Sequence, residues 1–127
     1  MNTEFKFALA VVAGTALGAA AMQGLHAQTK PKAYLVSETE ILDAAANAAF
    51  VPLVQAAQKA AGARNFNTAG GRIAAMEGTA PKRVAITEWN SLEEAQAFYK
   101  SKAWNDIAPQ RDKAIKTIRR YAVEANN

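Results

Sequence analysis

A strand-like segment runs directly into a helix start in the second half of the chain, and this junction constrains the fold more than any other feature. Residues 83–89 concentrate β-branched and aromatic side chains, which favour a strand. Ser91 follows, with Glu94 three residues later, and this spacing is a capping box that begins a helix. A strand followed at once by a helix is typical of a domain whose sheet is covered by helices.

Residues 33–61 supply an earlier strand and helix. Residues 33–41 have the β-rich, half-alternating pattern of a strand. Asp43 is placed to cap a helix, which is expected to extend to about residue 61, where Gly62 supplies the stop. Pro52 lies inside this segment. Either the helix bends there, or the main helix begins near Pro52.

The rest of the chain completes the order of elements. Three short strands are expected, two of them joined as a hairpin by a tight turn at Gly70 and Gly71. They span residues 64–68, 72–77 and 115–125. A helical turn over residues 102–108 is expected to end near Pro109, although residues 110–115 could remain helical. The order β-α-β-β-(β)-α-β is the split β-α-β pattern of an α+β, ferredoxin-like sandwich with both helices on one face. The opposite face still carries apolar residues, and self-association would cover it.

The first 27 residues predict an export signal rather than part of the domain. Residues 7–22 carry no charge, and the small residue Ala27 follows at a cleavage position, as in a secretory signal peptide. The apolar run is shorter than the roughly 20 residues of a spanning helix, so we expect cleavage after Ala27. An uncleaved anchor is the alternative and the one expected membrane contact. The chain is thus divided into a signal peptide (1–27), a polar leader (28–32) and a periplasmic or secreted domain (33–125).

The composition argues against several classes of chemistry. The chain has no cysteine, and its one histidine, His26, falls in the predicted signal. The domain therefore lacks the usual ligands of zinc and haem and the most common general base, and we expect neither a metal nor a cofactor. The net charge of +4 comes from scattered residues, whereas nucleic-acid binders gather Lys and Arg on one face. No nucleic-acid partner is expected.

Short motifs along the domain, taken in order, resemble those of a known family. They are Ala33-Tyr34, Gly62-Ala63-Arg64, Gly70-Gly71, Glu77-Gly78, residues 83–89, residues 91–95, residues 98–101, Trp104 and Arg111. In this order and spacing the chain from Ala33 to about Glu124 resembles the family called domain of unknown function 1330. The resemblance implies a dimeric α/β barrel, in which two ferredoxin-like sheets pack face to face, and it implies no activity. Ala69 stands where members of that family often carry an arginine.

The candidate site lies among aromatic side chains that this fold places beside the cleft between sheet and helices. Trp89, Tyr99 and Trp104 would supply an apolar wall. Arg83 and Arg111 would hold a carboxylate or phenolate, because the guanidinium fork matches such groups. The alternative is that these aromatics belong to the core or the dimer interface and that the arginines are structural.

Three functions are compatible with these residues. The sequence does not decide whether the protein is an enzyme, and it does not rank the second hypothesis against the third. The leading hypothesis is an exported homodimer that binds a small aromatic or acidic molecule. A cofactor-independent oxygenase or isomerase is an analogy with fold relatives, and Asn67 or Glu88 would be its weak catalytic candidates. The third hypothesis is a structural interaction protein without a small-molecule site.

Overall fold

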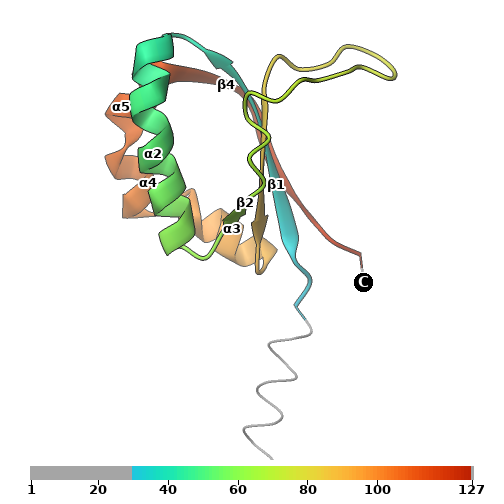
Figure 1. The fold of residues 1–127 in the computed structure, drawn as a ribbon. Coiled ribbons are helices and arrows are strands. Elements are labelled where there is room, and N and C mark those ends of the chain that lie inside the picture. Colours follow the sequence, from blue (N-terminus) through green and yellow to red (C-terminus); the bar gives the residue numbers. More distant parts are fainter. Residues whose placement is uncertain (1–29, 127) are drawn as a thin grey trace, which may run out of the picture. The chain divides into compact units, whose positions relative to one another are not determined.

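The computed structural model describes residues 30–126 (Figure 1). The predicted signal peptide, its cleavage position after Ala27, His26 and the first two residues of the leader lie outside the described residues. Within the described range the elements are β1 (Ala33–Ile41), α2 (Ala44–Ala60), β2 (Arg64–Asn65), β3 (Val84–Trp89), α3 (Leu92–Phe98), α4 (Lys102–Asp106), α5 (Ala108–Ala114) and β4 (Ile115–Glu124). No helix in this range is long and apolar enough to cross a membrane.

The strands form one antiparallel sheet in the order β2-β3-β1-β4. Strand β3 lies between β1 and β2, which is the split β-α-β arrangement, and the helices lie on one side of the sheet (Figure 1). The predicted ferredoxin-like α+β fold is confirmed. Strand β1 pairs with β3 on one side and with β4 on the other, so it is a central strand of the sheet.

The core lies between the sheet and the helices and is rich in aromatic side chains. Trp89 is 1% exposed and packs against Phe98, with their ring centroids 5.2 Å apart. Its indole Nε1 donates to Thr87 Oγ1 at 2.9 Å, which satisfies a buried polar group. Leu35 and Phe50 are buried in the same cluster. The junction of residues 83–91 thus supplies both a strand and part of the core.

Helix α2 begins and ends where the sequence predicts. Asp43 is its N-cap, and the carboxylate accepts from the Ala46 backbone N–H at 2.7 Å. The helix continues through Pro52 as a single element. It ends before Gly62, whose φ of 92° lies in the region that glycine adopts without steric cost.

The predicted hairpin over residues 64–77 is wrong, although its turn forms. Strand β2 stops at Asn65 because the Asn65 side chain accepts from the Asn67 backbone N–H at 2.8 Å, and Asn67 takes a φ of 57°. Such a local side-chain bond competes with the strand ladder. Gly70 lies in a turn closed by the Gly71 N–H bonded to the Thr68 carbonyl. Residues 69–79 are all exposed, so no buried face orders residues 72–77 as a strand.

The segment before the last strand also differs from expectation. Pro109 lies in the first turn of α5, where its missing N–H has no intrahelical acceptor to lose. The proline therefore begins a helix instead of ending one, and residues 110–114 are helical, which is the alternative that the sequence left open. Strand β4 follows over nearly the predicted range. The last turn of α5 contains Arg111, so this helix carries one of the candidate site residues.

Candidate functional site

A central cavity of about 270 Å³ lies between α2 and the inner face of the sheet. Both its floor and its walls carry many polar side chains, in contrast to the apolar core beside it. Its lining includes Ser37, Thr39, Asn47, Gln55, Gln58, Asn65, Asn67, Arg83, Thr87, Tyr99, Trp104 and Arg120. Apolar pockets with a few placed polar groups are the usual ligand sites, and this cavity lies at the polar end of that class.

The alternation of β1 explains the polar floor. Leu35, Ser37 and Thr39 occupy every second position and are all buried, because residues at this spacing share one face of a strand. Leu35 joins the aromatic core, whereas Ser37 and Thr39 line the cavity. Thr87 contributes a third buried hydroxyl from β3. The sheet therefore presents hydroxyl groups where a core of this size would ordinarily be aliphatic.

Arg120 brings a positive charge to this floor. It lies directly across from Ser37 in the register of β1 and β4, and its Nε donates to Ser37 Oγ at 3.0 Å. Its guanidinium carbon is 4.9 Å from the Tyr99 ring centroid and 4.8 Å from that of Trp104. These are cation–π contacts. Burial lowers the pKa of Arg120, although a guanidinium stays charged in proteins.

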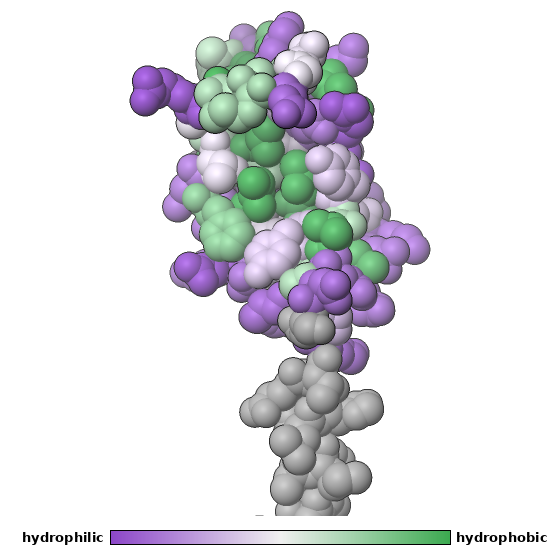
Figure 2. All heavy atoms as spheres, turned by 90° about the vertical axis from the view of Figure 1, so that its right-hand side faces the viewer, coloured by the Kyte–Doolittle hydropathy of each residue, from purple (hydrophilic) through white to green (hydrophobic). Residues whose placement is uncertain are grey.

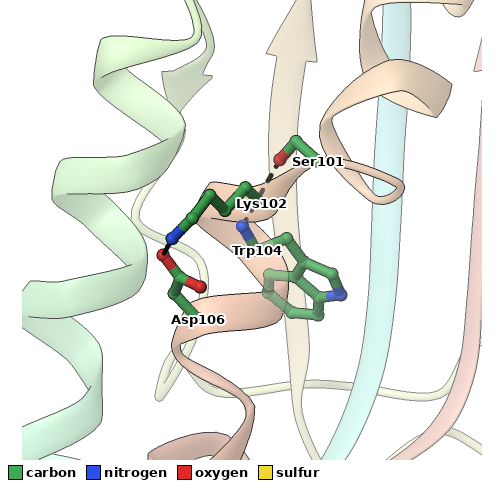
Figure 3. A network of polar contacts seen from close by, with 4 residues as sticks. All are labelled: Ser101, Lys102, Trp104 and Asp106. Atoms are coloured by element: carbon green, nitrogen blue, oxygen red, sulfur yellow. Dashed lines mark hydrogen bonds and ion pairs between the residues drawn. The ribbon is translucent and has the colours of Figure 1, made fainter.

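Two short helices hold the aromatic wall in place. Ser91 caps α3 by accepting from the Glu94 backbone N–H at 3.1 Å. Ser101 caps α4 by accepting from the Trp104 backbone N–H, and Lys102 pairs with Asp106 one turn along the same helix (Figure 3).

Tyr99, which follows α3 as its C-cap, and Trp104 of α4 meet edge to face. The centroids of Tyr99 and Trp104 are 4.7 Å apart. Burial raises the pKa of Tyr99 and outweighs the lowering effects of Arg120, Gln58 and Ser37, so its phenol remains a hydrogen-bond donor at neutral pH.

The cavity carries positive charge without a balancing acid. Arg83 and Arg120 line it, and no aspartate or glutamate of residues 30–126 does. Within residues 30–126, neither arginine forms an ion pair. Both arginines are half-buried, and a charge partly withdrawn from water is ordinarily paired. The arrangement therefore suits an anionic group that enters from outside the chain.

A third arginine, Arg111, adds positive charge close to the cavity, although it is not part of the lining. The Arg111 guanidinium carbon is 4.5 Å from the Trp104 ring centroid. Its Nη1 is buried and has no hydrogen-bond partner, and its Nε contacts the exposed Asp112 carboxylate at 3.3 Å. Arg111 also acts to lower the pKa of Arg120, which is the effect of one positive charge on another.

The structure brings together some of the predicted site residues and separates others. Arg83, Tyr99, Trp104 and Asn67 line the cavity. Arg111 touches Trp104 but is not part of the lining, and Trp89 is a core residue.

Glu88 is separated from the other candidates. It lies across from Tyr34, outside the cavity lining, with its carboxylate 3.6 Å from Lys32 Nζ. Among residues 30–126, no group of three or more His, Cys, Asp or Glu side chains is placed to hold a metal.

Sequence reasoning missed Arg120, the arginine most enclosed by the aromatic wall. A signal for it was present, because Arg119 and Arg120 are neighbours on a predicted strand and successive strand residues point to opposite faces. One of the two therefore had to point toward the helices. Which one did so depended on the register with β1, which shifts between Glu38 and Thr39.

Comparisons with solved structures support the fold alone. A protein of unknown function from Rhodopseudomonas palustris is similar, with a TM-score of 0.57 and 11% identity over 77% of this chain and 85% of that chain. A protein from Chloroflexus aurantiacus J-10-fl, named for antibiotic biosynthesis monooxygenases, gives a TM-score of 0.45 and 15% identity over 76% of this chain and 94% of that one. The second likeness is too weak to carry an argument. No curated protein matches the chain.

A family model settles the relationship that the motifs indicated. The model described as "Domain of unknown function (DUF1330)" matches residues 32–125, which contain every element of the fold and the whole lining of the central cavity. The chain therefore belongs to the DUF1330 family.

Proposed function

We propose that this protein binds a small organic anion in the central cavity, with Arg120 as the principal anchor. The observation that carries the proposal is a half-buried guanidinium with hydroxyl and aromatic partners and no carboxylate among the described lining residues. A guanidinium binds carboxylates through short, charge-assisted hydrogen bonds. Tyr99 adds a protonated phenol beside it, which can donate to the same anion.

The aromatic part of the earlier hypothesis also has support. Tyr99 and Trp104 line the cavity together with Phe50 and Val54, so the ligand can bury apolar carbons against the wall while its anion contacts Arg120.

Isothermal titration of the full chain with benzoate and with benzamide tests the charge requirement. Benzoate should bind, and Arg120→Met should abolish its binding. Equal binding of the neutral benzamide would contradict the proposal.

We further propose that the protein is a homodimer formed through the outer face of the sheet. An outer patch, exposed or half-buried, covers this face and consists of Tyr34, Val36, Phe66, Ile86, Tyr121 and Val123. Figure 2 views the side away from the helices and has apolar residues at its centre with hydrophilic residues around them. Tyr121 and Val123 are 51% and 57% exposed. Monomers rarely leave a contiguous apolar patch of this kind uncovered.

A second copy is the occupant that the charges favour. Next to the patch Arg119 donates twice to Glu38, at 2.9 and 2.7 Å, and Lys32 pairs with Glu88. These charges are balanced within the chain, so the rim selects no strongly charged partner, and an apolar patch is complementary to its own two-fold copy.

Sedimentation velocity should give a dimer for the full chain and a monomer for Val123→Asp. Leu53→Asp, which changes an exposed leucine on α2, should remain dimeric.

Export remains part of the proposal and is supported by the charge-free residues 7–22. Expression of the full gene in a Gram-negative host, followed by fractionation and intact mass measurement, tests it. The expected product is a periplasmic chain that begins at Gln28. A cytoplasmic chain that keeps its first 27 residues would contradict both the export and the cleavage.

The oxygenase alternative has one supporting observation, which is that Asn67 lines the same cavity as Tyr99. The amide could hydrogen-bond a substrate carbonyl there, whereas Glu88 lies outside the cavity lining. Oxygen consumption in the presence of phenolic acids, compared between the native chain and Asn67→Ala, tests this candidate. An absence of turnover with any phenolic acid that binds would leave the protein a binding protein.

A further inference from the structure

The central cavity has a second positive anchor at a different place from Arg120. Arg83 precedes β3, and its carbonyl accepts from the Thr39 backbone N–H at 3.0 Å, so its backbone lies beside Thr39. Arg120 lies on the other side of β1, across from Ser37. Both arginines line the cavity. The two arginines therefore lie on opposite sides of β1. Their neighbours on β1, Thr39 and Ser37, are two residues apart.

The sheet geometry sets the separation of these anchors. Strands β3 and β4 are each one strand spacing from β1, and Ser37 and Thr39 are two residues apart. These spacings put the Cα atoms of Arg83 and Arg120 about 12 Å apart. The Arg120 guanidinium is held beside β1 and β4, because it donates to Ser37 Oγ of β1 at 3.0 Å and to Thr117 Oγ1 of β4 at 3.4 Å. The side chain of Arg83 has no hydrogen-bond partner among residues 30–126.

We propose that the ligand is a dianionic organic acid of the dicarboxylate class, with one carboxylate on Arg120 and the other on Arg83. This inference rests on the proposed function and extends it. A single carboxylate would leave one of the two cavity guanidiniums without a counter-charge, whereas two carboxylates neutralise both. No acid of the lining competes for either arginine.

The neutral polar groups fit the stretch of ligand between the two carboxylates. Asn47, Gln55 and Gln58 line the cavity from α2, and Asn65 and Asn67 line it from the segment around β2. Amides both donate and accept hydrogen bonds, so they match hydroxyl or keto oxygens on the carbon chain. The site thus recognises two charged ends and a polar middle, and the wall of Tyr99 and Trp104 lies at the Arg120 end.

Matched pairs of acids test the proposal directly. Isothermal titration of the full chain, at fixed ionic strength, would compare succinate, glutarate and adipate with butyrate, pentanoate and hexanoate. For at least one chain length the dicarboxylate should bind at least about tenfold more tightly than its monocarboxylate, which corresponds to about 1.4 kcal/mol. Arg83→Met should reduce that dicarboxylate to the affinity of the monocarboxylate. Arg72→Met, which removes an exposed loop arginine outside the lining, should leave both affinities unchanged.

The outcomes separate this inference from the proposed function. Arg120→Met should remove binding of both kinds of acid, and thermal melts of each variant establish that it is folded. Monocarboxylates that bind through Arg120 with no dicarboxylate advantage would overturn the two-anchor proposal and leave the anion-binding function standing. A dicarboxylate advantage that survives Arg83→Met would overturn the role of Arg83. Binding of neither class to the folded protein would overturn the two-anchor proposal, and if benzoate also failed to bind, the anion-binding function would be overturned with it.

Discussion

Replacing Arg120 with methionine should leave the unliganded protein as stable as the native chain or more stable. The substitution removes the hydrogen bond to Ser37, worth about 1 kcal/mol, a longer and weaker one to Thr117 at 3.4 Å, and two cation–π contacts worth about 0.5–1 kcal/mol each. It also removes the cost of burying a guanidinium that has no carboxylate partner, which is several kcal/mol, and the repulsion from Arg111. The expected net change lies between zero and a gain of about 2 kcal/mol.

Urea unfolding of the extensively dialysed full chain measures this change, because the free energy of unfolding falls linearly with denaturant. In thermal melts, 1 kcal/mol corresponds to about 4–8 °C for a domain of this size. Arg119→Met is the matched control. It removes the neighbouring arginine, whose partner Glu38 has a side chain only 8% exposed, and it should destabilise the protein. A loss of more than about 2 kcal/mol on Arg120→Met would refute the reasoning and make Arg120 a structural residue.

Three further predictions concern the frame that holds the site. Thr87→Val should cost about 1–3 kcal/mol in urea unfolding, because the buried Trp89 Nε1 loses its acceptor, and an unchanged midpoint would mean that another group accepts from it. Ser91→Ala should cost about 1 kcal/mol through loss of the α3 cap, whereas Ser91→Asp should retain most of the stability. Hydrogen bonds from Arg119 lower the pKa of Glu38, so this carboxylate contributes stability above its ordinary pKa of about 4.3 and loses it as the pH falls through the lowered value. Glu38→Gln should therefore be less stable at pH 7 and show a flatter stability profile below pH ~4.3, and an acid profile identical to that of the native chain would contradict the assignment.

Local patterns predicted the elements whose signals lie within a few residues. Asp43 and Ser91 cap their helices as predicted, and Gly62 follows the end of α2, because caps and stops depend on a single turn of backbone. The order of these elements was sufficient for the ferredoxin-like sheet. The prediction failed over residues 72–77, because this short segment has no neighbouring strand or buried face to order it.

The sequence by itself determined the fold class, the family and a shortlist that includes Arg83, Tyr99 and Trp104. The tertiary structure decided which of these meet in one cavity. The register between β1 and β4 places Arg120 on the cavity side of the sheet, because a shift of one residue would exchange the two faces of the strand. The sequence also could not show that the cavity arginines lack an acidic partner, because its acids and bases are scattered. Ion pairing depends on distances between strands that lie far apart along the chain.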